Sequence, residues 1–337
     1  MSEIAHAPKD VEAVGAPVLS VSNLSITFNS PAGPVRAVDD VSFSLARGRI
    51  LGLVGESGCG KSVTASSLLG LVRSAQTGGR ILFDGHDLAG LSEEDWQSIR
   101  GSAISMIFQE PMTSLNPVFT VGEQIAEVLR VHRRLSRAQA HEQAVVALRR
   151  VNIPAPEERA KEYPHRLSGG MRQRVMIAMA LACEPQVLIA DEPTTALDVT
   201  VQAQILALID ELRRRQGTAV LFITHDLGVI AEFADDVAVM YLGNIVERGA
   251  AADLLNSPQH PYTLGLLGST PKLDARAERL TVISGQVPMP SRRPSGCTFH
   301  QRCPFADEHC ARDVPPHREI APAHWVSCWK APIELHA

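Results

Sequence analysis

Short apolar runs without a charged residue recur along most of the chain and predict strands. Runs of this length suit strands that are buried on both faces of a sheet. They are ILGLV at 50–54, VLIA at 187–190, AVLFIT at 219–224 and VAVMY at 237–241. The apolar residues within 205–212 have the i, i+3, i+4, i+7 spacing of an amphipathic helix, which Asp198 would cap. Strands that alternate with helices predict an α/β fold with a doubly wound sheet.

The first third of the chain has a different pattern. LSVSNLSITF at 19–28 and GRILFDGHDL at 79–88 indicate antiparallel strands, the second with a turn at Asp84-Gly85. From about 112 to 168 no strong strand run occurs, and the apolar spacing is helical. This stretch is expected to form a helical subdomain, in which the basic run RVHRRLSRAQ is a solvated helix face.

The two ends of the chain differ from the region between them. Residues 1–17 contain acidic residues and no apolar core, so they are expected to be a disordered tail and not a signal peptide. After residue 256 proline becomes frequent and helical periodicity fades. The predicted division is therefore a tail at 1–17, a main domain at 18–255 and a C-terminal module at 256–337.

Composition limits the classes of function. The chain has 337 residues, of which 45% are hydrophobic and 20% charged, with a formal net charge of −5. These values are ordinary for a globular protein, and the acidic balance argues against a general nucleic-acid binder. No apolar run approaches the roughly 20 residues that span a bilayer. A cytoplasmic protein is expected, with any membrane association made through a partner or a surface.

A glycine-rich phosphate-binding loop follows the strand at 50–54. GESGCGKS matches GxxxxGK[ST] and precedes a helical stretch, which is the context that this motif requires. Its backbone N–H groups and the helix N-terminus would face the phosphates of ATP, the lysine would add charge, and the serine would bind Mg²⁺. The cysteine side chain is expected to be inert, because the backbone makes the contacts. The loop residues are Gly55, Glu56, Ser57, Gly58, Cys59, Gly60, Lys61 and Ser62.

Polar residues at the ends of other predicted strands complete a candidate catalytic site. In QVLIADEP, Asp191 is expected to hold Mg²⁺, and Glu192 to act as the general base that polarises the attacking water. His225 would contact the γ-phosphate, and the Gln109 amide would sense Mg²⁺ and water. Taken singly, His225 fits a structural histidine and Gln109 a loop amide; their places after apolar runs favour the catalytic interpretation.

The segment LSGGMRQR at 167–174 closely resembles the signature of ABC ATPases. Its Ser168-Gly169-Gly170 precede a helical stretch and would form a second anion site. The resemblance implies a P-loop NTPase core with an antiparallel β subdomain and a helical subdomain. It also implies that these three residues face ATP held by a partner, so that each chain supplies half of two sites. The family places a seam loop at 195–198 and an aromatic ring, here Phe28, against adenine.

Three segments are similar to the peptide/nickel importer branch of the family. They are Glu56 in the phosphate loop, QEPMTSLNP at 109–117 and HPYT at 260–263. The branch implies a heterodimer with a second, related ABC ATPase and two transmembrane permease subunits. A periplasmic or lipid-anchored substrate-binding protein would act indirectly, and the chain would lie peripherally on the cytoplasmic face of the inner membrane.

The expected cargo is a di- or oligopeptide, with nickel chelates or other small peptides as alternatives. Two other classes of function are alternatives: an ABC ATPase that acts on nucleic acid or ribosomes, and a nucleotide-gated regulator without transport. The nucleic-acid class has tandem ATPase domains or long coiled-coil inserts, whereas this sequence has one ATPase core and no coiled-coil heptads. The importer interpretation is therefore favoured, with no nucleic acid among the partners.

Four cysteines near the end of the sequence have the spacing C-x5-C-x6-C-x17-C. Four thiolates can ligate a [4Fe–4S] cluster or tetrahedral zinc. Subunits of the branch resemble this cysteine pattern, and some of them carry a [4Fe–4S] cluster. A [4Fe–4S] cluster with a structural role is the favoured interpretation; zinc and free thiols are the alternatives. The cysteines are Cys297, Cys303, Cys310 and Cys328, and His300, His309, His317 and His324 are nearby as substitute ligands.

Overall fold

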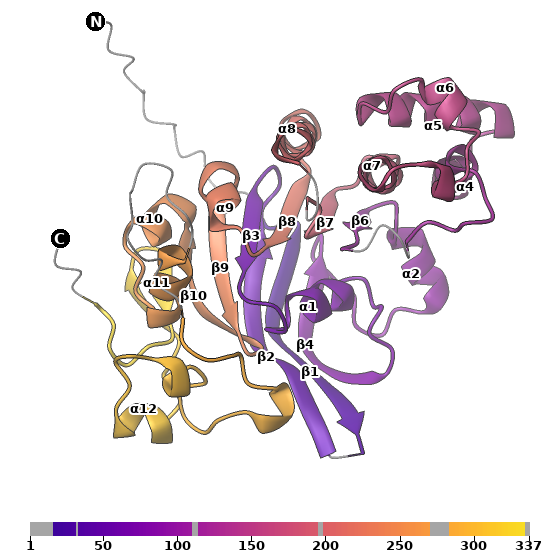
Figure 1. Ribbon diagram of the computed structural model, residues 1–337. Coiled ribbons are helices and arrows are strands. Elements are labelled where there is room, and N and C mark those ends of the chain that lie inside the picture. The colour runs from indigo at the N-terminus through magenta and orange to yellow at the C-terminus, as the bar shows by residue number, and fades with distance from the viewer. Residues whose placement is uncertain (1–15, 32, 110–113, 195–197, 270–282, 334–337) are drawn as a thin grey trace, which may run out of the picture.

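The computed structural model describes residues 16–31, 33–109, 114–194, 198–269 and 283–333, and these residues form two sheets with helices around them (Figure 1). One sheet is antiparallel with the order β2-β1-β4-β5, and the other has the order β11-β12-β10-β9-β3-β8-β7-β6. The strands are β1 (Leu19–Ser30), β2 (Gly33–Leu45), β3 (Ile50–Val54), β4 (Ala75–Phe83), β5 (His86–Asp87), β6 (Ile104–Ile107), β7 (Val187–Asp191), β8 (Ala219–Thr224), β9 (Asp236–Tyr241), β10 (Asn244–Ala250), β11 (Arg318–Ala321) and β12 (His324–Val326).

The expected α/β fold with an antiparallel subdomain is confirmed. The runs at 50–54 and 219–224 are strands with the predicted bounds, and the other two runs lie in slightly longer strands. The turn at Asp84-Gly85 joins β4 to β5, and both residues have the positive φ that a tight hairpin turn requires.

The parallel part of the large sheet positions the polar loops. β6, β7, β8, β3 and β9 pair in parallel, in that order. The residues of β3, β6, β7 and β8 are all buried, as continuous apolar strands should be. Since the carboxyl ends of parallel strands share one edge of the sheet, the loops after these four strands meet there.

Helices cover the large sheet and form a layer at the end far from the antiparallel sheet (Figure 1). That layer contains α4, α5 and α6, within the predicted helical subdomain. The helices are α1 (Lys61–Ser67), α2 (Glu93–Ile99), α4 (Val121–Arg133), α5 (Arg137–Arg150), α6 (Pro156–Arg159), η1 (Pro164–Arg166), α7 (Gly169–Leu181), α8 (Val199–Gln216), α9 (Leu227–Phe233), α10 (Ala251–Asn256), α11 (Pro261–Gly268), η2 (Pro290–Arg292), η3 (His300–Arg302) and α12 (Glu308–Arg312).

The predicted start of α8 is confirmed, because Asp198 accepts a hydrogen bond from the Val201 N–H at 2.9 Å. Within the described residues no helix is both long and apolar enough to cross a bilayer. The predicted tail lies outside the described residues except for 16 and 17. The same holds for 110–113 of the segment at 109–117 and for 195–197 of the seam loop.

Residues after 256 extend the large sheet. β12 pairs antiparallel with β10, and β11 pairs with β12. The Glu247 side chain of β10 is fully buried. It accepts hydrogen bonds from the backbone N–H groups of Gln259 at 2.7 Å and His260 at 2.9 Å. A His324 ring nitrogen lies 2.8 Å from the same carboxylate. A buried carboxylate needs such partners, so Glu247 joins the C-terminal segment to the sheet.

Candidate active site

The phosphate loop connects β3 to α1, and its glycines are required by its backbone. Gly55, Gly58 and Gly60 have φ values of 154°, 80° and 105°, which L side chains rarely adopt. A Cβ on Gly55 would lie 2.2 Å from the Met240 carbonyl oxygen, and one on Gly60 would lie 2.8 Å from the Ala37 carbonyl oxygen. The loop is therefore pressed against neighbouring backbone on one side, which leaves its other side as the ligand face.

Lys61 folds back over this loop. Its side chain is buried, and Nζ donates to the carbonyl oxygens of Gly55 at 2.7 Å and Glu56 at 3.0 Å. The Cys59 sulfur lies 3.8 Å from the same Nζ, and burial raises the pKa of the Cys59 thiol. A thiol with a raised pKa is a poor nucleophile, in agreement with the inert role expected for Cys59.

Asp191 ends β7 with an unsatisfied oxygen. The residue is 3% exposed, and its Oδ1 has no hydrogen-bond partner among the described residues. Burial raises the pKa of Asp191, while the Ser62 hydroxyl and the Lys61 charge oppose this rise. Buried polar atoms are normally paired, so this carboxylate oxygen, beside a serine hydroxyl and an ammonium, could accept a cation or an ordered water.

The Glu192 carboxylate contacts two of the other predicted site residues. Gln109 Nε2 donates to Glu192 Oε2 at 3.2 Å, and His225 Nδ1 lies 3.5 Å from Oε1. The Glu192 side chain is 13% exposed and that of His225 is 64% exposed. Glu192 also has a φ of 48°, an uncommon value for a residue with a side chain. The predicted base, amide and imidazole thus meet where β7, β6 and β8 end.

Ser168, Gly169 and Gly170 form the exposed start of α7. Ser168 is the N-cap, and its Oγ accepts from the Met171 N–H at 3.3 Å. A Cβ on Gly169 would meet no atom within 4 Å, so packing inside this chain does not require a glycine there. A hollow of about 360 Å³ beside Ser168 is lined by residues such as Asn152 and Arg174, and by none of the phosphate loop.

Phe28 lies on β1, opposite Val35 and Ala75 of the neighbouring strands. It is half-buried and packs against the hydrophobic cluster beneath the antiparallel sheet. The contact of the Phe28 ring with the adenine of ATP stays a prediction.

The four C-terminal cysteines are free thiols that influence one another. Burial raises the pKa of Cys297 to about 11, and Cys328, Cys303 and Cys310 add to this rise. Burial likewise raises the pKa values of Cys303 and Cys328, again with contributions from neighbouring cysteines. Among the described residues, however, no group of three or more His, Cys, Asp or Glu side chains is placed to hold a metal ion.

Each of the four nearby histidines has one ring nitrogen in contact with another group, and their use as substitute ligands stays a prediction. Nδ1 of His300 lies 2.8 Å from the Cys297 carbonyl oxygen, and Nδ1 of His309 lies 3.1 Å from Asp313. His317 contacts the Ser327 hydroxyl, and His324 contacts the buried Glu247.

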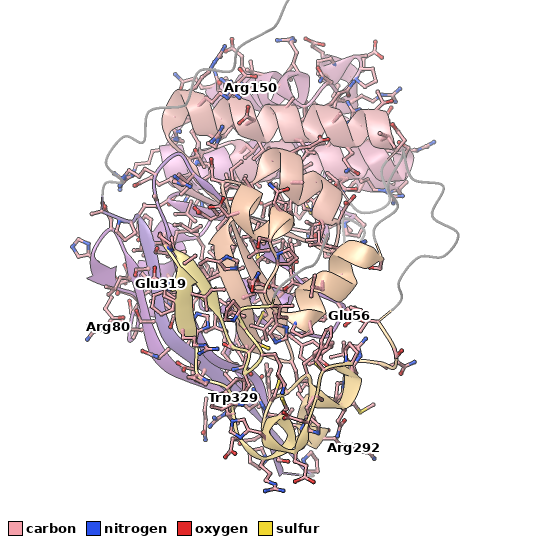
Figure 2. The ribbon with its side chains drawn as sticks, turned by 90° about the vertical axis from the view of Figure 1, so that its left-hand side faces the viewer. Glu56, Arg80, Arg150, Arg292, Glu319 and Trp329 are labelled. Carbon is pink, nitrogen blue, oxygen red and sulfur yellow. The ribbon has the colours of Figure 1, made fainter. Side chains whose placement is uncertain are left out.

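Two residues at the phosphate loop were missed in the sequence. The Arg302 guanidinium makes a bidentate ion pair with Glu56, with N–O distances of 2.7 and 2.9 Å, and the Tyr262 hydroxyl accepts from the Glu56 N–H at 2.7 Å. Figure 2 labels Glu56 where the loop meets the C-terminal part of the chain. Tyr262 belongs to the HPYT segment, but no sequence pattern links it or Arg302 to a residue about 200 positions earlier.

Two parts of the chain match known families. Residues 38–195 match the family described as ABC transporter, and residues 246–310 match the C-terminal region of oligopeptide/dipeptide transporters. The first match contains the phosphate loop, the α7 signature and the Asp191-Glu192 pair, and the second contains Tyr262, Arg302 and the first three clustered cysteines.

Two relatives align with nearly the whole chain. The dipeptide transport ATP-binding protein DppD of Bacillus subtilis (strain 168) is 52% identical over 315 residues, which are 93% of this chain and 94% of the relative. The oligopeptide transport ATP-binding protein OppD of Escherichia coli (strain K12) is 51% identical over 319 residues, which are 94% of each chain.

Solved structures agree with the fold. The ATP-binding cassette MJ0796, a dimer in a post-hydrolysis state bound to ADP and Pi, has a TM-score of 0.64 and 27% identity; the match covers 69% of this chain and 98% of the cassette. Structure and sequence therefore agree: this chain is an ABC-type ATPase and belongs to the ABC transporter family, among the ATP-binding proteins of dipeptide and oligopeptide transport.

Proposed function

We propose that this chain binds and hydrolyses ATP to energise a membrane importer of di- or oligopeptides. The observation that carries the proposal is the match of residues 246–310 to the C-terminal region of oligopeptide/dipeptide transporters, in a chain that also has the full set of nucleotide-site residues. The names of the relatives DppD and OppD, which describe dipeptide and oligopeptide transport, support the same cargo.

ATP would bind with its phosphates on the open face of the loop 55–62. The Lys61 ammonium, now held by two carbonyl oxygens, is close enough to exchange them for phosphate oxygens. Ser62 and the orphaned Oδ1 of Asp191 supply oxygen ligands for Mg²⁺, which in nucleotide sites keeps several waters and phosphate oxygens in its shell. Gln109 would complete this shell, and the Phe28 ring would lie against the adenine.

Hydrolysis would use Glu192 as the general base for the attacking water. The Glu192 carboxylate accepts a hydrogen bond from Gln109 and lies beside His225. These contacts orient it at the edge of the sheet where the γ-phosphate of ATP would lie. The His225 side chain is 64% exposed, so it has room to turn toward a γ-phosphate. The transition state would be stabilised mainly by position and charge.

The second anion site would serve a nucleotide bound to a partner. Ser168, Gly169 and Gly170 lie at the exposed N-terminus of a 13-residue helix, whose free N–H groups favour an anion. Gly169 is not needed for packing within this chain, which is expected of a surface that another molecule approaches. We therefore propose a heterodimer with a second, related ABC ATPase, in which each subunit completes the other's site.

The pair of ATPases would act on two transmembrane permease subunits, fed by a substrate-binding protein. No described helix of this chain is suited to cross a bilayer, so it would lie peripherally on the cytoplasmic face of the membrane, held by the permease. Closure of the dimer on ATP and its opening after hydrolysis would then drive the permease.

The four cysteines would ligate a [4Fe–4S] cluster. No group of three or more His, Cys, Asp or Glu side chains among the described residues is placed to hold a metal ion, so the proposal rests on the number and spacing of the cysteines. The thiols are nevertheless close enough to influence one another's pKa, as ligands spread over the irons of a cluster would be. Iron analysis and absorbance near 400 nm of anaerobically purified protein test this role, which a colourless, iron-free sample would reject.

The test of transport uses vesicles that contain the permease pair and both ATPases. ATP enclosed with this chain should drive uptake of a labelled peptide in the presence of the binding protein, and the Glu192→Gln variant should abolish uptake. ATP hydrolysis without uptake of any di- or oligopeptide, in vesicles that do take up a nickel chelate, would contradict the peptide cargo.

A further inference from the structure

Every polar group of Glu56 in the phosphate loop has a partner, and two of the three partners come from the C-terminal part of the chain. The backbone N–H donates to the Tyr262 hydroxyl at 2.7 Å, and the carboxylate accepts two hydrogen bonds from Arg302. The carbonyl oxygen accepts from Lys61 at 3.0 Å. A shift of Glu56 would therefore move the lysine that is expected to contact the phosphates.

Arg302 is held rigidly for this contact. Its side chain is 4% exposed, and Nε donates to the Ser284 carbonyl oxygen at 2.9 Å. The guanidinium also lies over the rings of Tyr241 and Phe299, at 5.8 and 5.9 Å from their centres. A planar fork with several fixed donors matches a carboxylate in one orientation, which a lysine ammonium does not.

The same residue belongs to the cysteine region. Arg302 ends η3, and the residue that follows it is Cys303. The start of that turn is fixed to another cysteine, because the His300 N–H donates to the Cys297 carbonyl oxygen at 3.0 Å. The fold around the cysteines thus determines where the guanidinium lies.

Tyr262 strengthens the link from a second direction. It is fully buried, and its ring packs on Tyr241 and Phe299 with centroid distances of 4.7 and 5.4 Å. The packing of the ring on Tyr241 and Phe299 fixes the direction of the Tyr262 hydroxyl toward the Glu56 N–H. These aromatic contacts and the Arg302–Glu56 ion pair therefore both hold the phosphate loop in place.

Charge gives the contact a consequence for nucleotide binding. A carboxylate in a phosphate loop repels a triphosphate unless it is neutralised, and low exposure strengthens both effects. The Arg302–Glu56 pair is only partly exposed, with side-chain exposures of 4% and 31%. The arginine therefore both cancels the charge of Glu56 and holds its backbone in the shape that presents Lys61.

We propose that Arg302 is a positioning residue of the phosphate loop, through which the cysteine-bearing C-terminal region sets the affinity of this chain for ATP. The inference rests on the proposed function, since it assumes that ATP occupies the loop. It assigns to the C-terminal region a direct part in nucleotide binding, in addition to any part in holding a cluster.

The test measures the dissociation constant of Mg-ATP by calorimetry on the full chain, together with the melting temperature without nucleotide. Arg302→Met is expected to weaken binding about tenfold, the scale of one charge-assisted hydrogen bond. Arg302→Lys should restore part of the affinity, because it returns the charge without the fork. Arg312→Met is the matched control, because Arg312 pairs with Glu308 in the same region but both side chains are well exposed.

The double variant Glu56→Gln/Arg302→Met separates coupling from general damage. If Arg302 acts through Glu56, the double variant binds ATP no more weakly than Arg302→Met, whereas an additive loss contradicts the proposal. Should Arg302→Met not fold, Arg302→Lys and Glu56→Gln carry the test, and wild-type affinity in both overturns the proposal. A wild-type chain that fails to bind ATP overturns the proposed function as well; wild-type affinity in Arg302→Met, with a lowered melting temperature or without one, overturns this inference alone.

Discussion

Asp191 and Glu192 are adjacent carboxylates in different surroundings. Asp191 is 3% exposed, with an unsatisfied oxygen and a hydrogen bond from the Ser62 hydroxyl. Glu192 points to the Gln109 amide and the His225 ring instead. Burial of an unpaired oxygen is unfavourable unless a cation or water completes it, while an oriented, partly exposed carboxylate can accept a proton from water. The local environments therefore favour a metal ligand in the first residue and a base in the second.

Glu192→Gln tests the base. The amide keeps the size of the side chain but cannot accept the proton, so ATP hydrolysis at this chain's own site in the assembled pair should fall by about a hundredfold or more. Binding of ATP should remain, and the closed dimer should accumulate in size-exclusion chromatography with ATP. Hydrolysis at the wild-type rate would remove Glu192 from this role.

Lys61→Ala tests the phosphate loop. Loss of the ammonium should weaken ATP binding by about tenfold to a hundredfold, the scale of its charge-assisted bonds to phosphate oxygens. Lys161→Ala is a control, since Lys161 is an exposed residue of the helical subdomain. Calorimetric titration with Mg-ATP measures both variants, and equal affinities would contradict the assignment of the loop.

The roles of single residues could be predicted from the sequence where neighbouring residues along the chain form a motif. The glycines, Lys61 and Asp191 stand in a fixed order after apolar runs, and the backbone angles of the loop explain why glycine is needed. Arg302 was not predictable, because its partner Glu56 is 246 positions away and an arginine beside a cysteine has no characteristic pattern. Only the folded chain shows that contact.

At the scale of elements, the buried Glu247 of β10 joins the main sheet to the C-terminal segment. Its carboxylate binds the backbone at the start of α11 and the ring of His324 on β12. His260 is the N-cap of α11, and its Nδ1 accepts from the Tyr262 N–H at 3.1 Å. This cap orients α11, and with it the Tyr262 hydroxyl that holds the phosphate loop.

The His260 cap predicts a pH dependence of stability. Burial lowers the pKa of His260 to about 4, with Glu247 opposing the shift. An unfolded histidine has a pKa of about 6.5, so the unfolded chain takes up the proton first as the pH falls. Stability from neutral His260 is therefore present above pH 6.5 and is lost between about pH 6.5 and 4, by about 3 kcal/mol.

His260→Asn removes this titration while an amide oxygen still caps the helix. Urea unfolding at pH 7 and pH 4.5 should show that the variant loses less stability than the wild type over this interval. Identical losses in the two proteins would show that protonation of His260 does not govern acid sensitivity.

Strand prediction succeeded in the parallel sheet and failed at its edge. Continuous apolar runs such as 50–54 and 219–224 reflect burial on both faces. β11 and β12 have only four and three residues, and β11 includes Arg318 and Glu319. Short edge strands of this kind have no clear apolar pattern, and their pairing depends on β10, about 80 positions earlier.

At the scale of the molecule, two surfaces suited to anions lie on different elements. The phosphate loop follows β3, whereas Ser168 and the glycines after it begin α7, beside a hollow to which the loop contributes no residue. In Figure 2 the helical layer with Arg150 and the C-terminal part with Trp329 and Arg292 lie at opposite ends of the molecule. A chain that presents both surfaces outward is suited to a partner that completes each of them.

Ser168→Arg tests the second surface. A long cationic side chain at the N-cap would fill the space for the partner's γ-phosphate, so ATP hydrolysis at the partner's site should fall by about a hundredfold. ATP binding by this chain's own loop should be unchanged in calorimetry. A loss of that binding alone would show that both surfaces serve one nucleotide.

The most direct test of the account is the structure of the complete complex trapped with ATP by Glu192→Gln. The account predicts that a triphosphate on the loop 55–62 is covered by the partner ATPase, while Ser168 and Gly169 of this chain contact the γ-phosphate of the partner's nucleotide. A nucleotide enclosed by this chain alone, with the start of α7 far from any phosphate, would contradict it.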